Sequence, residues 1–155
     1  MSEQERRLGL SFSLKRGRSL IYWATIRALK NPKFIRFLFN SRDHKVAIQV
    51  ATPIDKEALK VPAVQDVQQY EIASKAFLRV LYKNCHWDES KNYRIYGTNY
   101  GDEQVVEFLL DEAIIIRDEE FRDPEINESE FENLTEYEIC LRTIEDIFLD
   151  GFFYA

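Results

Sequence analysis

A run of cations in the first third of the chain has the residue types and spacing best suited to chemistry. Arg16 and Arg18 flank Gly17, so their side chains project from a tight turn, while Arg27 and Lys30 share one face of a short helix. Side chains of this kind neutralise phosphates, and arginine also reads guanine edges. We therefore expect a nucleic-acid-binding surface made of Lys15, Arg16, Arg18, Arg27, Lys30, Lys33, Arg36 and Arg42.

The charge of the chain is strongly divided. Residues 1–62 hold 13 basic and 5 acidic side chains, a net of +8, and the remainder holds 8 and 22, a net of −14. This division indicates an anionic partner for the basic part, and Tyr22 and Trp23 are candidates to stack on single-stranded bases. The alternative for the charges is that the two parts neutralise each other within the fold. The alternative for the aromatic pair is that one residue packs in the core and the other at an interface.

The second candidate surface is the acidic, aromatic C-terminal segment. Aromatic side chains among carboxylates suit docking to a basic protein partner. The residues expected to bind such a partner are Phe131, Tyr137, Phe148, Phe152 and Phe153. The alternative is a helix with an apolar stripe, Tyr137, Leu141, Ile144 and Phe148, that packs on its own domain.

Other chemistries lack the residues that they require. Cys85, His86, His44 and Cys140 do not have zinc-site spacing, so we expect no metal. There is no glycine-rich phosphate loop and no nucleophile elbow, so we expect neither an enzyme nor a cofactor. The cysteines are expected to be reduced in a cytoplasmic protein, with one disulfide as the alternative. No apolar run approaches the roughly 20 residues that span a bilayer, and the first residues predict no signal peptide.

Alternation and turn chemistry predict a ββαββ unit in residues 1–62. Leu10 and Phe12 alternate with polar residues in a first strand, Gly17 permits a tight hairpin, and residues 19–23 return as the second strand. This hairpin would fix the positions of Arg16 and Arg18.

A short helix and a second hairpin complete this unit. Residues 25–30 predict the helix, with Thr25 as its N-cap and Pro32 just beyond its end. Residues 34–39 and 46–50 predict two strands that pair across a polar turn.

The rest of the chain predicts a similar unit and an acidic end. Residues 52–69 read as a linker with a short helix at 55–59. The elements expected next are a strand at 70–73, a helix at 74–83 capped by Ser74, strands at 92–97, 104–110 and 113–116, an acidic loop at 117–132, and a last helix to about residue 150. An internal duplication of the first unit is left open.

The fold class expected is therefore α+β. A small β-rich core of ββαββ type, with the duplication as an open alternative, carries short helices and a C-terminal helix. The three parts expected are a basic ββαββ unit at 1–62, a strand–helix–strand–strand unit packed on it at 63–116, and the acidic segment with its helix at 117–155.

The order of strand, basic turn, strand, short helix and hairpin resembles the AbrB-type swapped-hairpin proteins, which are bacterial DNA-binding regulators and antitoxins. The matching residues are Lys15-Arg16-Gly17-Arg18, Leu20-Ile21, Ile26-Arg27 and the hairpin at 33–50, about a quarter of the chain. The chain has Tyr22-Trp23 and Leu29-Lys30 where the family usually has Ile-Pro or Val-Pro and often Leu-Gly. The resemblance implies an intertwined dimer whose basic hairpins grip duplex DNA, and in antitoxins a tail that occupies the toxin.

The expected function is that of a cytoplasmic transcription regulator, bacterial or from a mobile element, that binds double-stranded DNA as a homodimer. A protein-interaction module, either antitoxin or adaptor, acting through the acidic segment is the first alternative. A purely structural subunit is the second.

Overall fold

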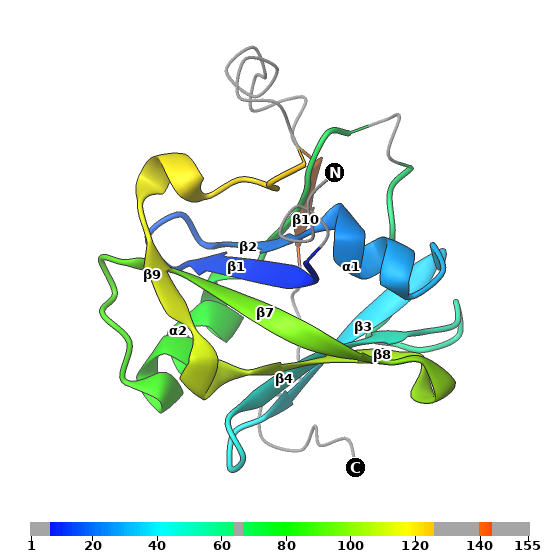
Figure 1. Cartoon of the computed structure of the whole chain (residues 1–155), viewed down its shortest axis with the longest axis horizontal. Helices are drawn as coiled ribbons and strands as arrows, with labels where there is room; N and C mark the ends of the chain where they lie inside the picture. The colour runs from blue at the N-terminus through cyan, green and yellow to red at the C-terminus, as the bar shows by residue number, and fades with distance from the viewer. Residues whose placement is uncertain (1–6, 64–66, 126–139, 144–155) are drawn as a thin grey trace.

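The computed structural model describes residues 7–63, 67–125 and 140–143, and within these ranges ten strands form one curled sheet (Figure 1). The strand order is β10-β6-β2-β1-β7-β8-β4-β3-β5, with β9 paired to β7, and all pairs are antiparallel except β10 with β6. The strands are β1 (Gly9–Ser13), β2 (Arg18–Ile21), β3 (Phe34–Asn40), β4 (Lys45–Val50), β5 (Leu59–Lys60), β6 (Tyr70–Ala73), β7 (Asn92–Tyr100), β8 (Val105–Leu109), β9 (Ile114–Ile116) and β10 (Cys140–Thr143). The helices described are α1 (Trp23–Ala28) and α2 (Lys75–Cys85), with 3₁₀ turns at Gly101–Glu103, Leu110–Glu112 and Asp118–Glu120.

The two hairpins predicted for residues 1–62 are confirmed. β1 and β2 pair around a turn at Gly17, whose φ of +68° suits a residue without a Cβ. Leu10 and Phe12 face the core from β1, as their alternation predicts. β3 and β4 pair in register as the second hairpin.

The short helix after β2 forms, but it begins and ends two residues earlier than predicted, so Lys30 lies beyond it. α1 starts at Trp23, with Tyr22 at the N-cap position. Thr25 is not the cap. It is buried, and its hydroxyl donates to the carbonyl of Gly9 (3.1 Å) and accepts from the N–H of Gly9 (2.9 Å). The threonine thus ties α1 to the start of β1, a contact that local sequence does not reveal.

The linker differs from its prediction, whereas the four strands and the helix predicted between residues 70 and 116 are confirmed. No helix forms at residues 55–59. The carboxylate of Asp55 accepts the N–H of Thr52 (2.9 Å) to close a polar turn, and β5 then pairs with the start of β3. The predicted strands β6, β7, β8 and β9 and the helix α2 all form.

The predicted α+β class is wrong, because the chain forms a strand-rich, curled half-barrel. The β1–β2 and β3–β4 hairpins do not pack together as one ββαββ unit, since the β7–β8 hairpin lies between them in the sheet. Figure 1 shows β1 and β2 above, β3 and β4 below, and β7 crossing between them. Local patterns specified the hairpins, but pairing between distant segments decided the architecture.

The predicted C-terminal helix is also contradicted where the chain is described. Cys140–Thr143 forms β10, which runs parallel to β6. Helical spacing of apolar residues suggested a helix here, but an edge strand such as β6 presents unpaired backbone groups that a short extended segment satisfies. The rest of the predicted helix lies outside the described residues.

Strand β7 joins the two halves of the sheet. It pairs first with β1 and then with β8, and Gly97 lies where the second pairing begins. A Cβ at this position would lie 2.6 Å from the ring of Phe108, so glycine permits the close approach.

Helix α2 packs into the core that the curled sheet encloses, with Phe77 against Phe37 and Phe39 at ring distances of 6.0 and 5.9 Å. Among the described residues, no helix is both long and apolar enough to cross a membrane.

Candidate nucleic-acid interface

The eight predicted cations lie on three different parts of the fold. Lys15, Arg16 and Arg18 belong to the β1–β2 hairpin, Arg27, Lys30 and Lys33 lie on α1 and in the turn after it, and Arg36 and Arg42 belong to the β3–β4 hairpin. We call residues 15–18 the basic turn. The partners of these side chains differ as much as their positions.

The basic turn contacts acidic residues of the segment 117–125, near the end of the described chain, although Lys15 and Arg16 stay exposed. The ammonium of Lys15 lies 2.6 Å from the Asp118 carboxylate. Arg16 donates to the backbone carbonyl of Asp118 (3.3 Å), and its guanidinium lies 4.9 Å from the ring centroid of Phe121. Hydrogen bonds from Lys15 and from Asn92 lower the pKa of the Asp118 carboxyl. We call residues 117–125, which make most of these contacts, the acidic clasp.

Two more arginines are also paired. Arg18 is half-buried, 3.6 Å from the carboxylate of Glu71 on β6. Arg27 makes a two-pronged contact with Glu125 of the acidic clasp, one arm of which measures 2.9 Å. Hydrogen bonding to Glu125 raises the pKa of the Arg27 guanidinium. The alternative of charge neutralisation within the fold therefore describes three of the eight cations, Lys15, Arg18 and Arg27.

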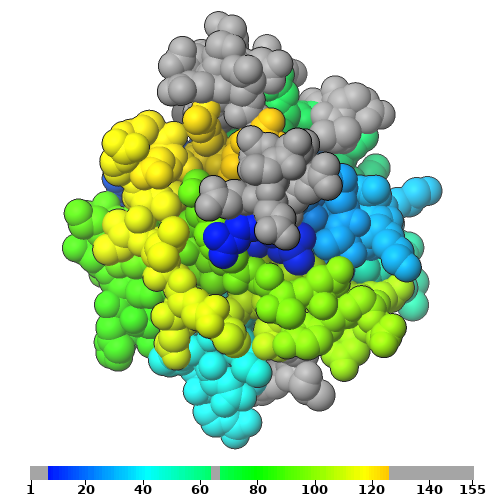
Figure 2. Space-filling view, in the orientation of Figure 1, coloured from blue at the N-terminus to red at the C-terminus, as the bar shows by residue number. Residues whose placement is uncertain are grey.

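A buried carboxylate fixes the acidic clasp to the sheet. Asp123 is fully buried, and its carboxylate accepts the backbone N–H of Trp23 (2.7 Å) at the start of α1 and that of Glu125 (3.0 Å). Its own N–H donates to Gln69 (3.0 Å), which in turn donates to Glu71 (2.8 Å). Burial raises the pKa of Asp123 to about 6. Figure 2 shows the exposed part of the clasp, in deep yellow to orange, at the surface beside β9.

The β3–β4 cations have neighbours of a different kind. Arg36 is half-buried and donates twice to the side-chain oxygen of Gln49 on β4 (2.9 and 2.7 Å). Arg42 is exposed in the hairpin turn, 4.0 Å from the carboxylate of Asp43. These arginines are therefore held on the far hairpin, apart from the basic turn.

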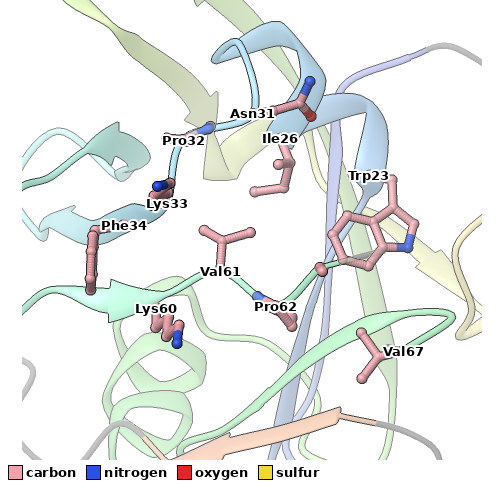
Figure 3. Close-up of a pocket in the computed structure, with 11 residues that line it drawn as sticks. Trp23, Ile26, Asn31, Pro32, Lys33, Phe34, Lys60, Val61, Pro62 and Val67 are labelled. Atoms are coloured by element: carbon pink, nitrogen blue, oxygen red, sulfur yellow. The ribbon is translucent and has the colours of Figure 1, made fainter. Parts of the chain in front are cut away.

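Of the two remaining predicted cations, Lys33 borders a groove between α1 and β5 (Figure 3), which we call the lysine groove. It has a volume of about 830 Å³. Its lining is mainly apolar and comes from Trp23, Ile26, Phe34, Val61, Pro62 and Val67. Lys33 on the β3 side and Lys60 on the β5 side add exposed ammonium groups, and within the described ranges neither makes an ion pair.

The turn between α1 and β3 shapes one rim of the groove. Lys30 and Asn31 both adopt left-handed backbone conformations, with φ of 65° and 51°. The N–H of Asn31 bonds to the carbonyl of Ile26 (3.0 Å), so this unusual turn is tied to α1. Lys30 and Asn31 are exposed, and in the described part of the chain their side chains have no partner.

Of the two lysines that line the groove, the sequence pattern singles out Lys33 but not Lys60, and it gives no sign of the groove itself. Lys60 lies in a segment that was read as a linker, and only its pairing in β5 opposite Phe34 brings it beside β3. No periodic signal marked it. The proposed stacking pair is enclosed instead: Tyr22 is 1% exposed and Trp23 is 6% exposed.

Two other predictions have a limited outcome. Among the described residues, no group of three His, Cys, Asp or Glu side chains is placed to hold a metal ion, and Cys85 is a free thiol. The predicted partner-binding residues Phe131, Tyr137, Phe148, Phe152 and Phe153 lie outside the described residues. Protein interaction through them stays a prediction.

Comparison with known proteins adds no relative from which a function can be taken. No family model, no curated protein and no solved structure matches the chain. The likeness to swapped-hairpin regulators stays a resemblance over the basic turn and its neighbours, and a function has to be argued from the interface.

Proposed function

We propose that the protein is a nucleic-acid-binding module and that the lysine groove, not the basic turn, is its contact surface. The observation that carries this proposal is the difference in charge pairing. Lys30, Lys33 and Lys60 make no ion pair within the described residues, whereas Lys15, Arg16, Arg18 and Arg27 each face a carboxylate or a backbone carbonyl of the acidic residues.

Unpaired lysines on a rigid rim suit an anionic polymer. A cation that is already paired must break its contact before it binds a phosphate, whereas an unpaired one releases only solvent and counterions. Lys33 and Lys60 are held by the β3–β5 ladder, since the carbonyl of Lys33 accepts the N–H of Val61 (2.9 Å) and Lys60 pairs with Phe34. The spacing of their backbone positions is therefore set before any ligand arrives.

A role in transcriptional control and a cytoplasmic location are part of the same proposal. The free thiol of Cys85 suits a reducing compartment. The resemblance to swapped-hairpin regulators points to a nucleic-acid target but concerns the basic turn and not the groove, and dimerisation stays a prediction of that resemblance.

Fluorescence anisotropy with a labelled single strand and its duplex, measured across a salt series, tests this function. We expect the affinity to fall as salt rises, and the double variant Lys33→Ala/Lys60→Ala to bind roughly tenfold less well, with a shallower salt slope. The matched control is Arg79→Ala/Lys83→Ala, which removes the same charge from the exposed face of α2.

The outcomes separate clearly. Loss of affinity in the groove variant alone supports the proposal. Absence of binding at low salt, or an equal loss in the control, contradicts it, because general charge and not the groove would then account for the effect.

A further inference from the structure

The lysine groove has an apolar floor that phosphate binding alone does not require. Trp23 and Ile26 form one wall from α1, and Val61 and Pro62 form the other from the segment after β5. A surface that only neutralises a backbone needs cations and not a hollow of about 830 Å³. The apolar lining therefore indicates that a second, uncharged part of the ligand enters the groove.

In a duplex, the faces of the bases are hidden in the stack, so an apolar hollow has nothing to receive from it. Single strands expose bases that stack on aromatic side chains and enter pockets. We propose that the groove takes an unstacked base of a single-stranded nucleic acid while Lys33 and Lys60 hold the phosphates on either side. This inference rests on the proposed nucleic-acid-binding function and narrows it to the single-stranded form.

Phe34 is the ring best placed to contact such a base. It is half-buried at the start of β3, lines the groove, and does not belong to the packed core. Trp23 is fixed more deeply, with its ring stacked on Tyr70 at 6.0 Å and its indole N–H donating to the carbonyl of Gln68 (2.7 Å). Trp23 therefore forms a rigid wall, and Phe34 presents the accessible aromatic surface.

Asn31 adds a polar group at the same rim. Its side-chain amide makes no hydrogen bond in the described part of the chain, and its backbone is held in place through Ile26. An amide offers a donor and an acceptor side by side, which matches the edge of a base. The groove thus combines cations for phosphates, a ring for a base face and an amide for a base edge.

The test compares four probes on the full chain: a labelled single strand, its duplex, an abasic strand of the same length, and polyglutamate as an acidic polypeptide. We expect the single strand to bind roughly tenfold more tightly than the duplex or the abasic strand, because stacking on an aromatic side chain contributes that much per base. Phe34→Ala should lower the affinity for the single strand by about the same factor and leave the abasic strand unaffected. Phe34→Tyr, which keeps the ring, should bind like the wild type.

Equal affinity for the single strand, the duplex and the abasic strand would overturn the inference while leaving the nucleic-acid function in place. Absence of binding to every nucleic acid would reject the proposed function itself. Competition by polyglutamate as strong as that by the single strand would identify an acidic protein as the occupant instead. A loss in Phe34→Ala that extends equally to the abasic strand would show that the ring only supports the fold, and this also overturns the inference.

Discussion

The basic turn and the lysine groove come from the same cation-rich stretch, but they use their charge in different ways. In the turn, Lys15 and Arg16 lie against Asp118 and the acidic clasp. In the groove, Lys33 and Lys60 face an apolar hollow and no carboxylate is paired with them in the described ranges. The difference teaches that a count of cations along a sequence does not say how many of them can bind a ligand, because an acidic segment from elsewhere in the chain can pair with them.

The largest expected effect concerns the carboxylate that fixes the clasp. The pKa of Asp123 in the folded protein is about 6, above its ordinary value of 3.8. The folded state therefore holds this proton more tightly than the unfolded chain does. The stability that this group contributes is fully present below about pH 4 and is lost as the pH rises through about 6, an effect of about 3 kcal/mol for about two pKa units.

Urea unfolding between about pH 4 and pH 7.5 measures this effect. The free energy of unfolding of the wild type should fall with rising pH relative to that of Asp123→Asn, which has no proton to lose. Glu71→Gln is measured alongside. Burial raises the pKa of Glu71 as well, so the free energy of unfolding of this variant should also fall less with rising pH than that of the wild type. Parallel curves for the wild type and Asp123→Asn would contradict the raised pKa of Asp123, because ionisation of this carboxyl would then not lower the stability of the fold.

Gly9→Ala tests how tightly the sheet packs beneath the clasp. A Cβ at position 9 would lie 2.3 Å from the ring of Tyr22, which is buried in a cluster with Phe121 of the clasp. The ring cannot move outward, so we expect the free energy of unfolding to fall by about 2 kcal/mol. Gly101→Ala is the control, since nothing lies within 4 Å of its added methyl group. Similar stability of the two variants in urea would show that the clasp yields easily.

The elements were largely readable from the sequence, but their arrangement was not. Alternation in β1, the glycine turn and the apolar face of α2 are local signals, and each gave the right element. No local signal predicts that β7 and β8 lie between the two hairpins in the sheet. Nor does one predict that Asp123 contacts the start of α1, 100 residues earlier in the chain. For the same reason the sequence could name cations but could not say which of them the acidic clasp would pair.

Loss of the Asp118 carboxylate should free Lys15 to contact a phosphate. Asp118→Asn removes the carboxylate that pairs with Lys15, so we expect affinity for a nucleic acid to rise about threefold, with a salt slope steeper by about one phosphate contact. Glu119→Gln is the matched control, because it changes the same charge one residue away and its partner is Arg117. Anisotropy across a salt series separates them, and an equal rise in both variants would reduce the effect to net charge.

The smallest expected effect belongs to the residues that the sequence marks most strongly. Lys15→Ala/Arg16→Ala removes two exposed cations from the basic turn, yet both already face the acidic clasp. We therefore expect this variant to lose less than about twofold in affinity, like the α2 control and unlike the groove variant. Cations that already contact the acidic clasp contribute little to phosphate binding, so their removal costs few phosphate contacts. Anisotropy of the three double variants at one low salt concentration ranks them directly. A tenfold loss at the turn would mean that the clasp opens when the ligand binds, and both regions would then form one interface.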